Sequence, residues 1–224
     1  MPISPLALVL DLDGTLVDSL PDLVASLSST LVAHGRPSVN RAQLRSMLGD
    51  GAEVLVQRAF ALTGDPGVPL ERSRFLAAFL EHYQAHSADR SSCFEGVHDT
   101  LAQLRADGHR LGVCSNKPHK ACIDLVAAMG LGDAVDAVLG GDALPQRKPD
   151  PAHLWATVRA MGAEGRPVVM VGDSAPDAEV ATNAGVPFVL AAYGYHRVPL
   201  DQLRADAIIE RFDELPGVLE GLVG

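Results

Sequence analysis

The pattern that most constrains the fold of this chain is the alternation of short apolar runs with helical stretches. The apolar runs lie at residues 6–10, 110–114, 135–139, 167–171, 187–191 and 207–209, and they are typical of strands buried in a parallel sheet. Helical patterns lie between them at residues 97–106, 117–129, 151–161 and 177–184. Glycines stand where these helices should end: Gly108, Gly130, Gly162 and Gly185. The alternation predicts an α/β fold with a doubly wound parallel sheet and right-handed crossovers.

Residues 17–90 interrupt this alternation. They contain helical stretches near residues 20–34, 41–48, 52–63 and 71–87, with no strand predicted among them. The first stretch begins at Asp18-Ser19-Leu20-Pro21, where a capping residue is followed by proline. We predict an all-helical domain at 17–90, inserted into an α/β core made of residues 1–16 and 91–224. Because the insert leaves and re-enters the core at one point, we expect it to cover the carboxyl ends of the strands, where such sheets bind ligands.

Composition and charge exclude several classes of partner. The chain has 224 residues, of which 47% are hydrophobic, enough for a sizeable core. A net charge of −10 argues against nucleic acid and anionic membranes, which attract basic surfaces. We find no apolar run of about 18 residues, the length a membrane helix requires, and no basic signal-peptide region at the first residues. The three cysteines suit free thiols in a reducing compartment. We therefore expect a cytoplasmic protein that binds neither nucleic acid nor a membrane, and the choice between monomer and homodimer stays open.

Paired carboxylates follow two of the predicted strands. Asp11 and Asp13 come directly after the first strand, and Gly14 allows the chain to turn tightly there. Asp173 ends another strand, and Asp177 stands four residues later at a predicted helix start. Carboxylates gathered at one edge of a sheet repel one another unless a cation compensates them. Mg²⁺ binds few carboxylates and keeps water ligands, so these residues predict a magnesium site.

Groups suited to a phosphoryl oxygen follow other predicted strands. Ser115 and Asn116 come after the strand at 110–114, where a hydroxyl and free main-chain N–H groups are expected at a helix start. Lys148 precedes Pro149 and Pro151, which stiffen the turn and hold the lysine in place. Read singly, Ser115 is equally well explained as a helix cap, and Lys148 is better explained as a solvated loop residue.

The order of these segments resembles the haloacid dehalogenase superfamily along the whole chain. The order is Asp-x-Asp, then Ser, then Lys, then Gly-Asp-x-x-x-Asp, and the helical insert resembles the first type of cap of that superfamily. Within it, the chain resembles the bacterial phosphoglycolate phosphatases most. That likeness rests on Gly49-Asp50-Gly51-Ala52-Glu53-Val54-Leu55 with Arg58-Ala59, Gly140-Gly141-Asp142 and Tyr193-Gly194-Tyr195. The resemblance implies a Rossmann-like core and hydrolysis of a small phosphomonoester, above all 2-phosphoglycolate, to glycolate and phosphate.

The resemblance also implies a role for each residue. Asp11 is the expected nucleophile that becomes an aspartyl-phosphate, and Asp13 is the expected general acid and base. Asp11, the Asp13 carbonyl and Asp173 are expected to hold Mg²⁺, with Asp177 acting behind them or through water. Ser115, the Asn116 amide and Lys148 are expected to hold the phosphoryl oxygens. The remaining residues expected to bind substrate are Thr15, Gly49, Asp50 and Arg58.

Three alternatives stay open. The chain could hydrolyse another small substrate, such as a sugar or amino-sugar phosphate. It could be a phosphomutase similar to β-phosphoglucomutase, although the Gly14-Thr15 pair is the phosphatase form. It could be a catalytically silent binding module, although Asp11, Asp13 and Lys148 are all present.

Overall fold

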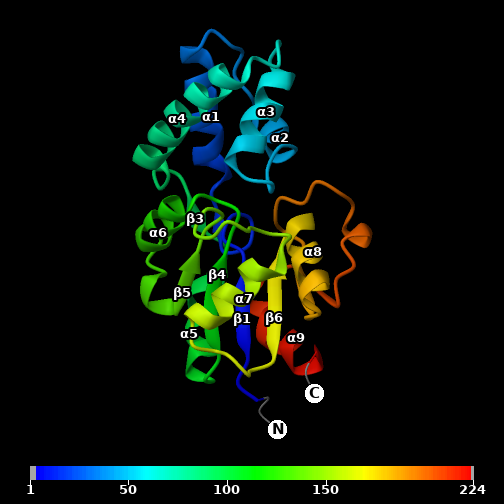
Figure 1. Cartoon of the computed structure of the whole chain (residues 1–224). Helices are drawn as coiled ribbons and strands as arrows, with labels where there is room; N and C mark the ends of the chain where they lie inside the picture. The colour runs from blue at the N-terminus through cyan, green and yellow to red at the C-terminus, as the bar shows by residue number, and fades with distance from the viewer. Residues whose placement is uncertain (1–3, 223–224) are drawn as a thin grey trace.

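The computed structural model of the chain describes residues 4–222 and contains a six-stranded sheet (Figure 1). Its strands are β1 (Ala7–Leu10), β4 (Arg110–Cys114), β5 (Ala137–Leu139), β6 (Val168–Gly172), β7 (Phe188–Ala191) and β8 (Ala207–Ile209). They lie in the order β5-β4-β1-β6-β7-β8, and every neighbouring pair is parallel. The chain builds the sheet outward from β1, first to one side and then to the other. The strand order therefore reverses beside β1, which is where such sheets bind ligands.

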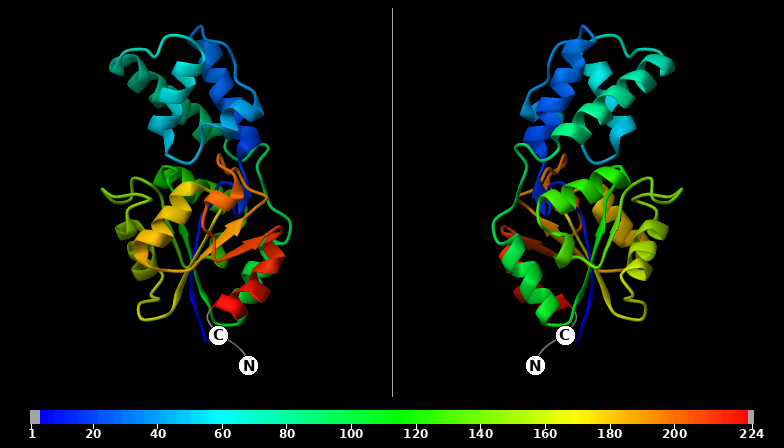
Figure 2. Two further views of the ribbon diagram at one scale, coloured as in Figure 1. Left: turned by 90° about the vertical axis from the view of Figure 1, so that its right-hand side faces the viewer. Right: turned by 90° about the vertical axis from the view of Figure 1, so that its left-hand side faces the viewer.

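Helices cover both faces of the sheet (Figure 2). Helices α5 (Val97–Ala106), α6 (His119–Ala128) and α9 (Leu215–Leu222) belong to the apolar cluster on one face, which includes Leu8. Helices α7 (Pro151–Ala160) and α8 (Ala175–Ala184) belong to the cluster on the other face, which includes Val9. Successive strand residues point to opposite faces, so the continuous apolar run of β1 supplies both cores.

A group of four helices lies over the carboxyl ends of the strands (Figure 1). These are α1 (Leu20–Ala33), α2 (Arg41–Arg45), α3 (Ala52–Leu62) and α4 (Pro69–His86), which share an apolar cluster of their own. Ala121 and Tyr195, from outside this group, also belong to that cluster. Three short 3₁₀ turns occur elsewhere, at Gly132–Ala134, Leu200–Gln202 and Phe212–Glu214. In the described part of the chain, no helix has both the length and the apolar character needed to cross a membrane.

The structure confirms the predicted α/β class and parallel sheet, and it corrects two local expectations. A short strand, β2 (Val17–Asp18), lies where the sequence analysis expected none, and it pairs antiparallel with β3 (Ser92–Cys93). Two-residue strands carry too little pattern to be recognised, and this one forms because the two connections run side by side. Ser19 is the N-cap residue of α1 but makes no side-chain capping bond. Its hydroxyl donates to Asp13 instead.

A buried histidine makes stability depend on pH. His153 in α7 is fully buried, and burial together with the positive charge of Lys148 lowers the pKa of His153 to about 4. The folded state holds this imidazole neutral, so its contribution to stability is complete above pH 6.5 and is lost as the pH falls toward 4. We expect the free energy of unfolding to fall by about 2 kcal/mol from this residue between pH 7.5 and pH 5.

Urea denaturation at the two pH values tests this expectation. The variant His153→Leu fills the same buried space with an apolar side chain of similar size. The slope of its free energy of unfolding against pH should be shallower by close to one proton. An unchanged slope in the variant would contradict the assignment.

Candidate active site

The central strand and its two neighbours place three polar residues at one edge of the sheet. Asp11 follows β1, and its main-chain N–H donates to Val171 O of β6 at 2.9 Å. Asp173 follows β6, and Ser115 follows β4 on the other side of β1. Parallel strands end at the same edge, so the pairing register alone brings these three residues together.

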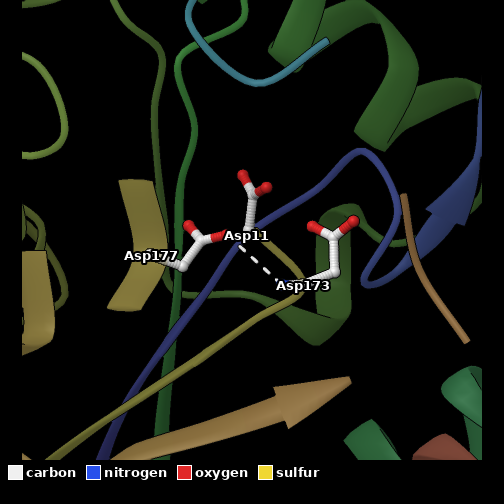
Figure 3. Close-up of side chains that lie close together, drawn as sticks. All are labelled: Asp11, Asp173 and Asp177. Atoms are coloured by element: carbon white, nitrogen blue, oxygen red, sulfur yellow. Dashed lines mark hydrogen bonds between the residues drawn. The ribbon is translucent and has the colours of Figure 1, made fainter. Parts of the chain in front are cut away.

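Three buried carboxylates meet at this edge (Figure 3). Asp11, Asp173 and Asp177 each offer an oxygen, and these oxygens lie within 4.8 Å of one another. Asp177 belongs to the first turn of α8, where its Oδ2 accepts from the Ser174 hydroxyl at 2.6 Å and from the Asp173 N–H at 3.2 Å. The helix start therefore fixes Asp177 and, through it, the loop that carries Asp173.

Lys148 supplies the positive charge inside this cluster. Its Nζ lies 2.6 Å from Asp177 Oδ1 and 2.9 Å from Asp11 Oδ1. The Lys148 side chain is 2% exposed and the Asp177 side chain is fully buried. Both oxygens of Asp177 are occupied by protein donors, whereas Asp11 Oδ1 accepts no hydrogen bond of regular geometry. The sequence analysis expected Lys148 to be held in place, and this pair of contacts holds it.

Burial perturbs the acids of the cluster. Burial raises the pKa of Asp11 to about 6, with Lys148 opposing and the Asp177 charge adding to the rise. Burial also raises the pKa of Asp173 well above its usual range, and the charges of Asp177 and Asp11 raise it further. The pKa of Lys148 is raised, because the two carboxylates outweigh its own burial. One lysine thus does not compensate three buried carboxylates.

The cluster fits a hard divalent cation. Such a cation would offset the cost of keeping Asp11 and Asp173 charged. Carboxylate oxygens are the ligands that Mg²⁺ prefers, and the only polar contact that the described residues give the buried Asp11 Oδ1 is the Lys148 ammonium at 2.9 Å. Asp177 is bound to Lys148 and to the loop that carries Asp173, so it fits the role of a residue that positions the metal ligands rather than binding the ion directly.

Asp13 lies beside the cluster and is held by two groups that the sequence analysis did not assign. Lys117 Nζ lies 3.1 Å from both Asp13 oxygens, and the Ser19 hydroxyl donates to Asp13 at 2.5 Å. Lys117 Nζ also donates to the Tyr83 hydroxyl at 2.7 Å and lies over the Tyr83 ring. Lys117 is one of only three lysines among 18 basic residues, and this rarity is the sequence signal that could have drawn attention to it.

A cavity of about 90 Å³ opens above Asp11. The cavity has room for several waters, since a cavity needs about 10–15 Å³ to hold one. Its floor is polar and comes from the strand ends, whereas helices α1, α3 and α4 and the loop before α3 contribute an apolar wall. That wall consists of Leu23, Leu48, Leu55, Phe79 and Leu80.

Most of the residues predicted for the site line this cavity. They are Asp11, Asp13, Gly49, Ser115, Asn116, Lys148 and Asp173. Asn116 joins two segments, because its side-chain amide donates to Gly49 O at 3.1 Å and to Lys148 O at 3.0 Å. That amide group is therefore engaged, so the main-chain N–H of Asn116 is the better candidate to face a ligand.

The structure does not bring three of the predicted substrate-binding side chains to the cavity wall. Thr15 is buried, and its carbonyl oxygen accepts from the Tyr193 hydroxyl. Asp50 Oδ2 lies 2.6 Å from Arg58 Nη1 and 2.6 Å from Arg197 Nη2. Arg58 also donates to a main-chain oxygen, that of Met47. Asp50, in the loop before α3, is thus paired with Arg58 of α3 and with the distant Arg197.

A tight loop supports Asp173 from behind. The Tyr195 N–H donates to Asp173 Oδ2 at 2.5 Å, and the Tyr195 hydroxyl donates to Asp18 at 2.5 Å. A side chain at Gly194 would overlap Asp173 and lie 2.6 Å from Gly14 O. The segment Tyr193-Gly194-Tyr195 therefore acts by packing against the site.

The three cysteines are free thiols, as the sequence predicts. Cys114 and Cys122 are buried, and Cys93 is half-buried. Burial raises the pKa of the Cys114 thiol to about 12, so it stays protonated and is a poor nucleophile at neutral pH. Cys114 is core, as expected from its place on β4.

Comparison with known proteins agrees with this geometry. Residues 8–191 match the family described as haloacid dehalogenase-like hydrolase. The chain is 42% identical over 215 residues to a phosphoglycolate phosphatase of Rhodospirillum rubrum, a match covering 94% of this chain and 89% of that one. It is 39% identical over 215 residues to a phosphoglycolate phosphatase of Cereibacter sphaeroides, a match covering 96% and 98%. A crystal structure described as a predicted phosphoglycolate phosphatase from Haemophilus somnus 129pt has a TM-score of 0.90, with 32% identity and coverage of 96% and 98%.

The fold and the acidic site define a hydrolase with a buried carboxylate centre at the switch point of a parallel sheet. The chain belongs to the haloacid dehalogenase-like hydrolases, as its motifs predict, and it is similar to the phosphoglycolate phosphatases among them. The predicted class of enzyme, a phosphoric monoester hydrolase, is thereby confirmed.

The packing around Gly194 gives a stability test. We expect Gly194→Ala to lower the free energy of unfolding by about 1–3 kcal/mol, because the added methyl group overpacks the buried loop against Asp173. The matched control is Gly132→Ala, where nothing lies within 4 Å of the added methyl group. Denaturant unfolding of both variants should show a loss for Gly194→Ala alone, and equal stabilities would contradict the packing role.

Proposed function

We propose that this protein hydrolyses 2-phosphoglycolate to glycolate and phosphate, through an aspartyl-phosphate on Asp11 and with Mg²⁺ as cofactor. One observation carries the proposal. Asp11, a carboxylate without a regular hydrogen bond on Oδ1, lies beside Lys148 at the floor of a small cavity. The names of the relatives support the choice of substrate.

The first half of the reaction transfers the phosphoryl group to the protein. A carboxylate oxygen of Asp11 attacks phosphorus, and the bond between phosphorus and the glycolate oxygen breaks. Asp13 gives a proton to the departing oxygen, which leaves as the hydroxyl group of glycolate. Lys148, at 2.9 Å from Asp11, reduces the repulsion between this carboxylate and an incoming dianion.

The second half returns the protein to its starting state. Asp13, now a carboxylate, takes a proton from a water molecule as that water attacks phosphorus. The bond between phosphorus and Asp11 breaks, and phosphate leaves. Two steps with lower free-energy barriers replace one step with a high barrier, which is the advantage of a covalent intermediate.

The remaining site residues position these groups. Asp11, the Asp13 carbonyl and Asp173 would hold Mg²⁺, and Asp177 would fix Lys148 and the Asp173 loop. When bound, the ion would supply positive charge for the phosphoryl oxygens and for the buried carboxylates. The Ser115 hydroxyl and the main-chain N–H of Asn116 would donate to the phosphoryl oxygens. Gly49 would contribute main-chain groups, whereas Asp50, Arg58 and Thr15 would act by shaping the loops that carry the binding groups.

We also propose that residues 17–90 act as a cap domain over the core of residues 1–16 and 91–224. Helices α1, α3 and α4 and the loop before α3 supply the apolar wall of the cavity, and closing such a wall over the site would exclude bulk water during transfer. The net charge of −10 supports a small-molecule partner rather than nucleic acid. We further propose that the protein is cytoplasmic and is either a monomer or a homodimer.

The nucleophile gives the most direct test. We expect the protein to release phosphate from 2-phosphoglycolate with Mg²⁺, to lose this activity in EDTA, and to regain it when Mg²⁺ is restored. Asp11→Asn should lower kcat by at least about 10⁴-fold, because the amide is not a nucleophile. Asp99→Asn, the same change on an exposed helix face, should leave kcat unchanged. Phosphate release by Asp11→Asn at the normal rate would rule out the mechanism.

A panel of phosphomonoesters tests the substrate. The cavity of about 90 Å³ favours a small molecule, so we expect kcat/KM for 2-phosphoglycolate to exceed that for hexose and amino-sugar phosphates. Product analysis by ³¹P NMR separates hydrolysis, which yields free phosphate, from isomerisation of a sugar phosphate. A higher kcat/KM for a hexose phosphate would reject the proposed substrate and keep the hydrolase.

A further inference from the structure

Lys117 is a buried cation in the cavity that the proposed mechanism does not use. Its side chain is 5% exposed, and its Nζ contacts both Asp13 oxygens and the Tyr83 hydroxyl. We propose that Lys117 is the specificity-determining residue that binds the carboxylate of the substrate, with Tyr83 of α4 holding it in place. The inference rests on the proposed function and adds the group that distinguishes a phosphomonoester carrying a carboxylate from one without it.

The position of Lys117 follows the geometry of the substrate. Asp13 is the group that protonates the leaving oxygen, so that oxygen must come within hydrogen-bond distance of Asp13. In 2-phosphoglycolate the carboxylate carbon is only two bonds from the leaving oxygen. A cation bound to Asp13 on the cavity side can therefore reach the substrate carboxylate. Lys117 is that cation, at 3.1 Å from Asp13.

No other basic side chain of residues 4–222 competes for this position. Lys117 and Lys148 are the basic side chains that line the cavity. Lys148 is taken by Asp11 and Asp177 on the phosphoryl side. Arg58 and Arg197 both lie 2.6 Å from Asp50, and neither side chain is part of the cavity lining.

The surroundings make this contact selective. The wall above Lys117 is formed by leucine and phenylalanine side chains, which give a carboxylate no compensation. The Tyr83 hydroxyl is a neutral acceptor, and burial raises the pKa of Tyr83 to about 12, so it remains neutral when Lys117 exchanges it for a carboxylate. Without Lys117, the substrate carboxylate would have no cation beside it, and it would face a second negative charge once Asp13 has given up its proton.

A pair of substrates isolates this role. Ethyl phosphate has the same two-carbon leaving group as 2-phosphoglycolate but no carboxylate. We expect Lys117→Met to lower kcat/KM by about 100-fold for 2-phosphoglycolate and by no more than about tenfold for ethyl phosphate, as for the loss of one charge-assisted contact. If Lys117 served only to position Asp13, both substrates would lose kcat by the same factor, and the proposal would be overturned.

Binding without turnover gives a second measurement. In Asp11→Asn protein, calorimetry should show that 2-phosphoglycolate binds about tenfold more tightly than ethyl phosphate, because only the former has a partner for Lys117. The double variant Asp11→Asn, Lys117→Met should bind the two ligands with equal affinity. A preference that survives in the double variant would also overturn the proposal.

Further controls separate the possible failures. Should Lys117→Met not fold, as judged by circular dichroism, Tyr83→Phe removes only the hydroxyl that holds Lys117. It should then raise KM for 2-phosphoglycolate several-fold more than KM for ethyl phosphate, and equal changes would contradict the assignment. A wild-type protein that hydrolyses neither ester with Mg²⁺ would reject the proposed function itself. Hydrolysis of both, with equal losses in Lys117→Met, would reject only the role of Lys117.

Discussion

The ion pairs of Lys148 with Asp11 and Asp177 are the interaction on which the rest of the site depends. Parallel strands end at one edge, so a sheet that carries acids at these ends concentrates negative charge in a buried place. A buried carboxylate is costly unless it is paired. Lys148 pairs two of them at once, and the loop from β6 to α8 occupies the remaining oxygen of Asp177. The nucleophile is thereby kept close to a positive charge without being enclosed by hydrogen bonds.

The contacts between helices α1–α4 and the sheet edge pass through residues of the site itself. Asn116 donates to Gly49 on one segment and to the carbonyl of Lys148 on another. Lys117 joins Asp13 to Tyr83 of α4. A displacement of these helices would therefore break the contacts that fix the phosphoryl-binding loops. The same hydrogen bonds therefore couple the position of the helices to the arrangement of the phosphoryl-binding groups.

The sheet and its acids were predictable because the relevant information is local. An apolar run marks a strand, parallel strands end together, and residues such as Asp11 and Asp173 then meet without further assumptions. Lys117 was not predictable in the same way, because its partners are distant in the sequence and belong to two different parts of the fold, Asp13 to the loop after β1 and Tyr83 to α4. Asp50 and Arg58 were predicted to bind substrate from their likeness to a motif. Their pairing, completed by the distant Arg197, appears only when the loops are brought together.

The use of lysine resolves the conflict between a net charge of −10 and an anionic substrate. Of the 18 basic residues only three are lysines, and two of these, Lys117 and Lys148, are buried in the site. A lysine ammonium is a compact charge that reaches two or three acceptors at a buried point, whereas an arginine fork requires a broad planar partner. Each buried lysine is paired with site carboxylates, so positive charge lies at the points where an anion would bind, even though the chain as a whole is acidic. The repulsion that the whole molecule exerts on an anion is screened by salt over about 8–10 Å, whereas these buried contacts are screened much less. Affinity for an anion therefore depends on the two lysines rather than on the charge of the chain.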